Sequence, residues 1–111
     1  MAGKFELKKS AKGQFMFNLK AGNNQVILSS ELYSDKASAQ DGIASVKKNA
    51  GTDANYERKT SKKGEPFFVL KAPNGQIIGQ SEMYASAKGM EAGLASVKAN
   101  GPAASVAEVT E

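Results

Sequence analysis

The stretch GIASVKKNAG spans residues 42–51, and the chain repeats it almost letter for letter as GLASVKANGP at residues 93–102. A shift of 51 positions aligns residues 5–51 with residues 56–102 without a gap, and 21 of the 47 aligned pairs are identical. Similarity at a fixed period indicates that one supersecondary unit is built twice and that the two copies share a core. The repeat therefore decides the architecture.

The chain is short enough to be one domain, because 111 residues lie within the usual size of a single folded unit. We expect residues 1–111 to form that domain, with repeat one at residues 4–51 and repeat two at residues 55–102. Residues 103–111 contain a further alternating stretch, which predicts a C-terminal strand or a tail that covers the sheet.

Each repeat begins with two strands and a turn whose register follows from the apolar positions. Residues 4–9 and 15–20 alternate apolar and polar side chains, as half-buried strands do. A three-residue loop between them pairs Leu7 with Phe17 and keeps the apolar side chains on one face. That loop type places a glycine in the left-handed conformation, which we predict for Gly13.

A second turn leads into a third strand. In repeat two this turn reads Pro-Asn-Gly at residues 73–75, a sequence typical of tight turns. The register of such a loop predicts that Ile27 lies opposite Leu19 and that Ile78 lies opposite Leu70. Each repeat is therefore expected to contain three antiparallel strands.

A helix completes each repeat. Asp35 and Ser86 occupy equivalent positions, and both are good N-cap residues because their side-chain oxygens accept hydrogen bonds from free backbone amides. Gly51 and Gly101 are typical of helix ends, where glycine favours a left-handed cap. The spacing of four and three predicts a buried helical face made of Ala39, Ile43, Val46, Met90, Leu94 and Val97.

These elements predict an α+β fold with two tandem β-β-β-α repeats in one compact domain. We expect an antiparallel sheet with the two helices packed on one face, related by a pseudo-twofold axis. Gly42 and Gly93 lie inside the helices, where glycine costs about 1 kcal/mol relative to alanine. Their repetition predicts a close approach between each helix and a neighbouring element, and a backbone contact with a ligand is the alternative.

Two stretches resemble a known family. The segment APNGQIIGQSEMY at residues 72–84 and the helix sequence GIASVKKNA at residues 42–50 are similar to those of the YegP-like family of small, mainly bacterial, tandem-repeat proteins. The resemblance covers nearly the whole chain and implies an α+β protein of two similar halves. That family has no assigned activity, so the resemblance carries over no catalytic residue.

The composition excludes much of enzyme chemistry. The chain contains no cysteine and no histidine, which removes disulfides, thiolate catalysis, the commonest general base and the commonest metal ligands. We therefore expect no catalytic residue, no cofactor and no metal. An enzyme that works with lysine, tyrosine and glutamate alone is the remoter alternative.

The hydropathy of the chain predicts its location. No apolar run approaches the roughly 18–20 residues that a membrane-spanning helix needs. The amino-terminal residues also lack the apolar core of a secretory signal. We expect a cytoplasmic protein that makes no membrane contact.

Several polar residues recur in both repeats. Between the third strand and the helix they are Ser30, Glu31, Tyr33, Ser81, Glu82 and Tyr84. A functional interpretation makes them paired polar sites. The favoured interpretation is structural: tyrosine packs its ring while serine and glutamate satisfy turn amides. In the helices, Ser45 and Ser96 face away from the predicted core and have no evident local role.

The face of the sheet opposite the helices is the predicted contact surface. It mixes lysine with apolar side chains, and a surface this apolar is rarely left to solvent. Its candidate residues are Lys8, Met16, Lys20, Val26, Lys59, Phe67, Val69 and Lys71, and the predicted register adds Leu28.

We therefore predict a small non-enzymatic binding module that contacts a protein partner of unknown identity, or a second copy of itself, through this face. A weak nucleic-acid-binding protein is the alternative, because lysine and aromatic side chains on a sheet can hold single strands. It is less favoured, since only Phe67 could stack a base and the chain has a single arginine.

Overall fold

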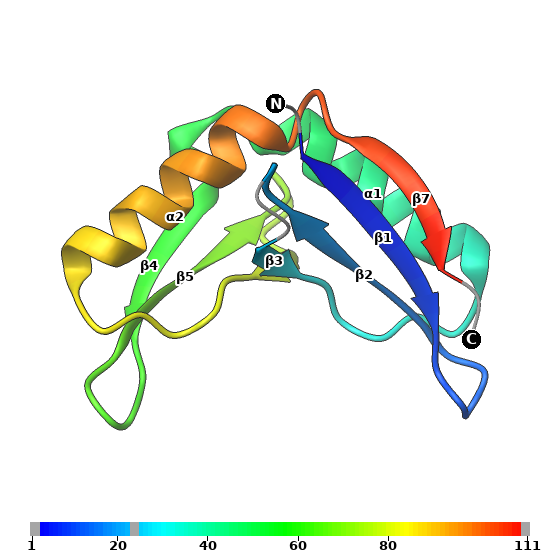
Figure 1. The fold of residues 1–111 in the computed structure, drawn as a ribbon, viewed down its shortest axis with the longest axis horizontal. Coiled ribbons are helices and arrows are strands. Elements are labelled where there is room, and N and C mark those ends of the chain that lie inside the picture. The colour runs from blue at the N-terminus through cyan, green and yellow to red at the C-terminus, as the bar shows by residue number, and fades with distance from the viewer. Residues whose placement is uncertain (1–2, 23–24, 110–111) are drawn as a thin grey trace.

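The computed structural model describes residues 3–22 and 25–109 (Figure 1). The elements follow the predicted order within each repeat, and a short 3-10 helix at Asp53–Asn55 links the two repeats. The strands and helices are β1 (Lys4–Lys9), β2 (Phe15–Lys20), β3 (Val26–Ser29), α1 (Lys36–Asn49), β4 (Tyr56–Thr60), β5 (Pro66–Lys71), β6 (Ile77–Gln80), α2 (Ala87–Asn100) and β7 (Ser105–Val109).

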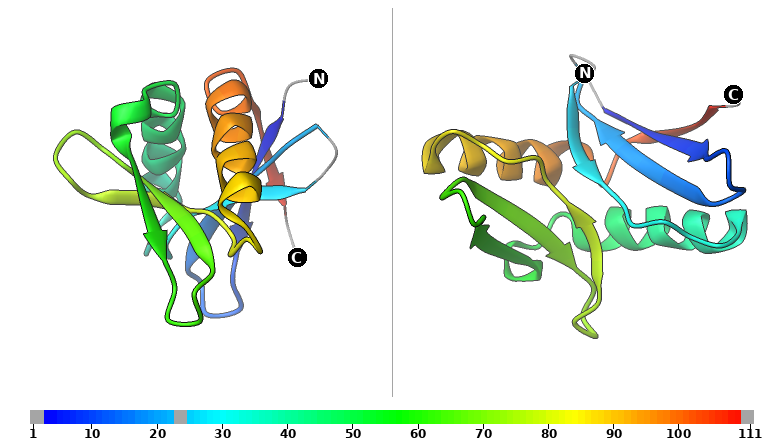
Figure 2. Two further views of the ribbon diagram at one scale, coloured as in Figure 1. Left: turned by 90° about the vertical axis from the view of Figure 1, so that its left-hand side faces the viewer. Right: turned by 90° about the horizontal axis from the view of Figure 1, so that it is seen from below.

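All of these strands join one sheet in the order β4-β5-β6-β3-β2-β1-β7. The two repeats meet at its centre, where β3 and β6 pair antiparallel at Ser29 and Gln80. The sheet is strongly twisted, and each helix packs against strands of both repeats (Figures 1 and 2). The predicted α+β fold with two similar halves is confirmed.

The sheet is mixed rather than wholly antiparallel, which corrects the prediction. β7 pairs in parallel with β1, and Phe5 lies beside Val106. A parallel partner is available because α2 returns the chain to the end of the sheet where β1 begins. β7 therefore extends the edge of the sheet and does not cover the face opposite the helices; residues 110–111 lie outside the described residues.

The first hairpin of each repeat forms as predicted. Leu7 pairs with Phe17 and Phe5 with Leu19. Gly13 and Gly64 occupy equivalent loop positions with φ of 82° and 84°. A side chain in that conformation would be strained, so these glycines fix the loop and, through it, the register.

A β-bulge makes the predicted register of the third strand wrong. In repeat two, Lys71 pairs with Ile77 as the loop requires, but the register then shifts, and Leu70 pairs with Gly79 instead of Ile78. A bulge places two successive residues of one strand opposite a single residue of its neighbour.

The same shift in repeat one pairs Leu19 with Leu28 instead of Ile27. Both Ile27 and Leu28 are buried in the core cluster, which extends between the sheet and the helices. Leu28 is fully buried there. It therefore does not lie on the opposite face, where the sequence placed it.

The helices begin at their predicted caps. The backbone N–H of Ser38 donates to Asp35 Oδ1 over 2.7 Å, and that of Gly89 donates to Ser86 Oγ over 3.1 Å. The predicted inward positions are all buried, namely Ala39, Ile43, Val46, Met90, Leu94 and Val97. Neither helix in the described part of the chain is long and apolar enough to cross a lipid bilayer.

The helix ends differ from the prediction. Gly101 caps α2 with φ of −56°, and Gly51 is not among the described glycines with positive φ, so neither forms a left-handed cap. Gly101 instead allows a close approach, because a Cβ there would lie 2.8 Å from the Cβ of Ala50. Ala50 and Gly101 are equivalent residues of the two repeats, so the helix ends meet near the pseudo-twofold axis.

Candidate functional site

The face of the sheet opposite the helices carries most of the predicted contact residues. The strand pairings place Lys8 beside Met16 and Lys59 beside Phe67 on this face. We call it the open face and define it by residues Glu6, Lys8, Met16, Asn18, Lys20 and Val26 of repeat one and Glu57, Lys59, Phe67, Val69, Lys71 and Ile77 of repeat two.

Two of the residues expected at this surface are not available for contact. Val69 is only 1% exposed, although it does not belong to the core beneath the helices. Its neighbours across the strands are Glu57 and Gln80. Leu28 belongs to the core, as described above. The accessible apolar part of the open face is therefore limited to half-buried side chains, chiefly Met16 and Phe67.

Glu6 is the centre of a charge cluster on the open face that sequence reasoning missed. Its side chain is 12% exposed and lies 3.0 Å from Lys20 Nζ, 3.5 Å from Lys4 Nζ and 3.9 Å from Lys8 Nζ. The hydrogen bond from Lys20 and the nearby positive charges outweigh burial and hold the pKa of Glu6 below its ordinary value. The signal was present in the sequence, because Glu6 is identical in repeat two as Glu57.

Glu57, the equivalent of Glu6 in repeat two, is also paired with lysines but is more exposed to solvent. It forms ion pairs with Lys71 and, over 3.9 Å, with Lys59, and its side chain is 44% exposed. The hydrogen bond from Lys71 lowers the pKa of Glu57. Each lysine predicted as a contact residue has a carboxylate partner on the same face. Lys8 and Lys20 share Glu6 with Lys4, and Lys59 shares Glu57 with Lys71, so a net positive charge remains.

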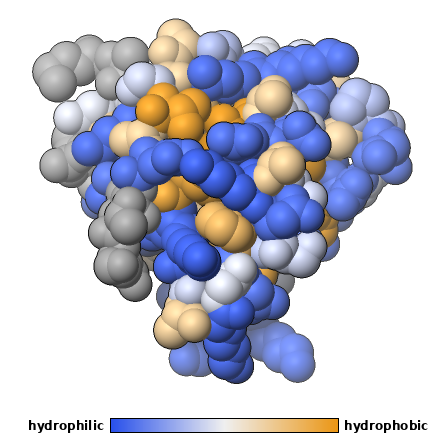
Figure 3. All heavy atoms as spheres, turned by 90° about the vertical axis from the view of Figure 1, so that its right-hand side faces the viewer, coloured by the Kyte–Doolittle hydropathy of each residue, from blue (hydrophilic) through white to orange (hydrophobic). Residues whose placement is uncertain are grey.

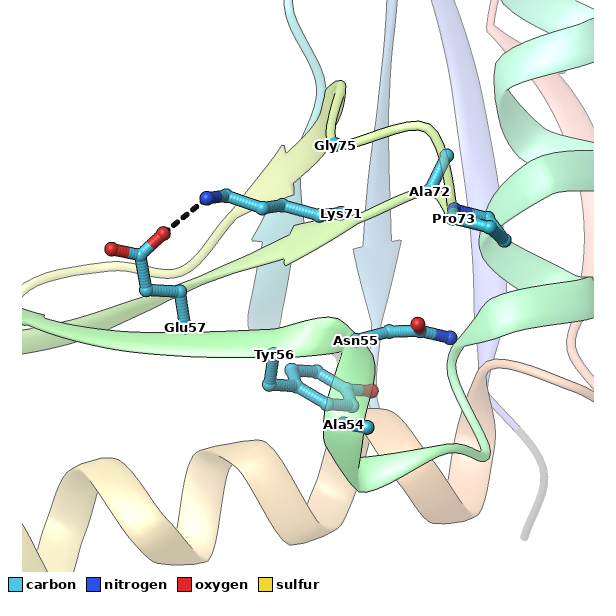
Figure 4. Close-up of a pocket in the computed structure, with 8 residues that line it drawn as sticks. All are labelled: Ala54, Asn55, Tyr56, Glu57, Lys71, Ala72, Pro73 and Gly75. Carbon is cyan, nitrogen blue, oxygen red and sulfur yellow. Dashed lines mark ion pairs between the residues drawn. The ribbon is translucent and has the colours of Figure 1, made fainter.

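A pocket of about 370 Å³ lies beside Glu57 and Lys71 (Figure 4). It is lined by Ala54, Asn55, Tyr56, Glu57, Lys71, Ala72, Pro73 and Gly75. In repeat one the position of Ala54 is taken by Gly3, which packs directly against the carbonyl of Lys20. The 3-10 helix contributes Ala54 and Asn55 to the lining of this pocket.

The repeated serines before the helices have structural roles. Ser30 Oγ accepts a hydrogen bond from the backbone N–H of Phe17 over 2.9 Å and donates to the carbonyl of Glu31 over 2.8 Å. Ser81 makes the same pair of bonds in repeat two, with Phe68 and Glu82. These bonds fasten the strand-to-helix connection to the neighbouring strand.

The repeated tyrosines explain the glycines inside the helices. A Cβ on Gly42 would lie 2.5 Å from the hydroxyl oxygen of Tyr33 and 3.0 Å from Phe17 Cε2. Gly93 is covered in the same way by the hydroxyl of Tyr84. The predicted close approach is confirmed, and its partner is a tyrosine of the same repeat. Burial, and secondarily the neighbouring glutamate, raises the pKa of each of these phenols.

Ser45 and Ser96 do have local partners, which corrects the prediction. The side-chain amide of Asn49 donates to the carbonyl of Ser45 over 2.8 Å and to its hydroxyl over 3.2 Å. Asn100 does the same to Ser96, over 2.8 and 3.1 Å. The repeated serine and asparagine therefore close the last turn of each helix.

Exposed apolar side chains occur elsewhere as well. Leu32 and Met83 are equivalent residues that are 57% and 42% exposed, and Val106 on β7 is 47% exposed. Around β1 and β7 the apolar surface is interrupted by hydrophilic side chains (Figure 3). Sequence reasoning did not single these residues out, because no apolar period distinguishes their positions.

The described acidic side chains do not gather into a metal site, and the two on the open face are paired with lysines. Within residues 3–22 and 25–109, no group of three His, Cys, Asp or Glu side chains could hold a metal ion. The carboxylates with the clearest partners, Glu6 and Glu57, are bound to lysines and have lowered pKa values, which is unfavourable for a general base at neutral pH.

A family described as a domain of unknown function, DUF1508, matches residues 10–57 and again residues 61–108. The chain belongs to the DUF1508 family. Its matches are offset by 51 residues, the same period as the internal repeat. Each match runs from the second strand of a repeat, through its helix, to the strand that follows.

UPF0339 proteins from several bacteria are similar to this chain over nearly their whole length. The UPF0339 protein YegP of Escherichia coli K12 is 56% identical over 110 residues, which cover 99% of this chain and 100% of YegP. A UPF0339 protein of Bordetella pertussis is 56% identical over 111 residues, covering 100% of this chain and 99% of that protein. The resemblance to the YegP-like family is confirmed.

Two solution structures share this fold. That of YegP from E. coli, described as a protein of unknown function, has a TM-score of 0.93 at 55% identity and covers 99% of this chain and 95% of that chain. That of the UPF0339 protein SO3888 from Shewanella oneidensis has a TM-score of 0.93 at 46% identity and covers 99% and 93%.

Proposed function

We propose that the protein is a small non-enzymatic binding module whose contact surface is the open face. The observation that carries this proposal is the placement of Met16 and Phe67. They occupy equivalent positions in the two repeats, both are partly exposed, and each lies beside a lysine of the neighbouring strand, Lys8 or Lys59. Apolar side chains ringed by charge are typical of contact surfaces.

The chemistry of the described residues favours binding over catalysis. Histidine and cysteine are absent from the sequence. The repeated serines and tyrosines are engaged in packing and backbone hydrogen bonds, which leaves them no free role as nucleophile or base. The partner in this proposal is a protein surface or a second copy of the chain.

Affinity capture from a bacterial lysate tests the proposal, with the double variant Met16→Ser, Phe67→Ser as the decisive comparison. Both side chains are partly exposed, so the variant should remain folded by circular dichroism. We expect it to lose a partner, or a self-association seen in sedimentation, that the unchanged chain retains.

The matched control is Leu32→Ser with Met83→Ser, which also removes one exposed apolar side chain from each repeat but lies outside the open face. The control should retain the partner. Identical capture and sedimentation profiles for the unchanged chain and the open-face variant would overturn the proposal.

A further inference from the structure

Lysines without a carboxylate partner among the described residues lie at the tips of two hairpins of the sheet. Lysines on the open face have carboxylate partners, whereas Lys9 and Lys12 in the first tip and Lys62 and Lys63 in the second are exposed. None of these four forms an ion pair with any residue that the structure describes. Lys9 lies over the ring of Phe15, with Nζ 5.8 Å from its centroid.

The two tips have the same rigid geometry. In tip one, residues 9–14, the backbone N–H of Ser10 donates to Gln14 O over 2.7 Å. In tip two, residues 60–65, the backbone N–H of Ser61 donates to Glu65 O over 2.8 Å. Both tips project to the same side of the molecule, away from the helices (Figures 1 and 2).

We propose that the two tips together contact the phosphate backbone of a double-stranded nucleic acid through Lys9, Lys12, Lys62 and Lys63. This inference goes beyond the proposed function, because the tips lie outside the open face and their partner is a nucleic acid rather than a protein. Exposed lysines without carboxylate partners can neutralise the phosphates of a nucleic acid, which then releases the counterions bound to it. The pseudo-twofold relation between the tips matches the twofold relation between the strands of a duplex.

The tips fit a duplex better than a single strand. Single strands are held mainly by stacking on exposed aromatic side chains, and on the described open face only Phe67 is aromatic. The longest dimension of the molecule is 35 Å, so the tips lie within roughly one helical turn of a duplex, about 34 Å. Phosphate contacts need no base readout and therefore no stacking platform.

The tips also fit a nucleic acid better than a membrane surface. A peripheral membrane site places large apolar side chains next to its basic residues, where they enter the lipid. The loops here contain Ala11, Lys12 and Gly13, and Lys62, Lys63 and Gly64. Lysine, without the planar fork of arginine, makes point-charge contacts, so we expect little dependence on base sequence.

Fluorescence anisotropy with a labelled duplex of about 20 base pairs, titrated across a salt series, tests the inference. Contact with about four phosphates predicts a slope of log K against log salt of about −3.6. Replacing Lys9, Lys12, Lys62 and Lys63 by Gln should weaken binding more than tenfold at low salt and bring the slope close to zero. Variants of one tip, Lys9→Gln with Lys12→Gln or Lys62→Gln with Lys63→Gln, should each lose about half of the slope.

The control changes the same amount of charge elsewhere, with Lys36, Lys47, Lys48 and Lys88 on the helices replaced by Gln. It should alter the affinity less than threefold. The inference is overturned if the duplex does not bind at low salt, or if the helix variant weakens binding as much as the tip variant. It is also overturned if single-stranded DNA, or vesicles rich in anionic lipid, bind more tightly than the duplex.

These outcomes are separate from those of the proposed function. If the duplex fails to bind while Met16→Ser with Phe67→Ser still abolishes capture of a partner, the open face remains the contact surface and only the nucleic acid is excluded. Lys12, Lys62 and Lys63 are exposed and make no ion pairs with described residues, so their variants should unfold at the same temperature as the unchanged chain. A Lys9 variant also loses the contact with the Phe15 ring.

Discussion

Leu28 of β3 packs against Gly79 of β6, and a Cβ at position 79 would lie 2.6 Å from Leu28 Cδ2. The two positions are equivalent in the two repeats. Because they meet where the repeats join, there is room for only one of the two side chains. Ala50 and Gly101 show the same relationship at the helix ends. At these two places the equivalent residues differ because the second side chain would not fit.

The first prediction concerns this pair. Gly79→Ala should destabilise the fold by about 1–3 kcal/mol, because an added methyl group overpacks a fully buried contact. Leu28→Ala should cost about 2–5 kcal/mol through the cavity that it leaves. In the double variant the new methyl group enters that cavity, so urea unfolding should show a combined cost below the sum of the two. Strict additivity would contradict the proposed contact.

The second prediction concerns Glu6 and pH. Since the pKa of Glu6 is lowered in the folded state, its contribution to stability is present above its unfolded-state pKa and is lost as pH falls through the folded-state pKa. Glu6→Gln should therefore lower the free energy of unfolding at pH 7 and have progressively less effect below pH 4.5, the ordinary pKa. Glu57→Gln is the comparison and should show a smaller difference, since Glu57 is 44% exposed.

The third prediction concerns the hydroxyl of Tyr56, which is buried and donates to the carbonyl of Ala50 over 2.6 Å. Tyr56→Phe removes this donor and leaves the carbonyl without it, so we expect a loss of about 1–3 kcal/mol in chemical denaturation. Tyr33→Phe removes the same atom from a half-buried phenol that donates no hydrogen bond to a described residue. A larger loss from Tyr33→Phe than from Tyr56→Phe would show that the Ala50 bond is unimportant.

The fourth prediction concerns β4, which forms one edge of the sheet. The equivalent strand of repeat one, β1, is covered by β7. Arg58 lies on this edge, with its guanidinium 3.0 Å from Glu91 Oε1 and 3.3 Å from Asp53 Oδ1. Charged side chains on an open edge discourage pairing with another chain. Arg58→Val should therefore self-associate at lower protein concentrations than the unchanged chain in sedimentation velocity. Lys48→Val, an exposed helix position, should leave the association unchanged.

Sequence reasoning located the candidate surface but misjudged its character. Alternation along the strands placed Lys8, Met16, Lys59 and Phe67 on one face, because side-chain direction in a strand follows from residue parity. It did not find the Glu6 cluster, although Lys4 and Lys8 flank Glu6 on the same face of β1 by the same parity. Only Lys20 is added by the pairing of β2 with β1. The face interpreted as apolar and basic is basic, but each of its lysines shares a glutamate, Glu6 or Glu57, in an ion pair.

The sequence by itself determined what depends on neighbours along the chain. Gly13 set the first hairpin, Asp35 and Ser86 started the helices, and apolar spacing chose their buried faces. Two features were visible only in the tertiary structure. One is the β-bulge that places the side chain of Leu28 in the core, and the other is the parallel pairing of β7 with β1. Turns, caps and periodicity are local properties of the sequence. The bulge and the parallel pairing depend on how separate segments pack together, and no single stretch of sequence determines that packing.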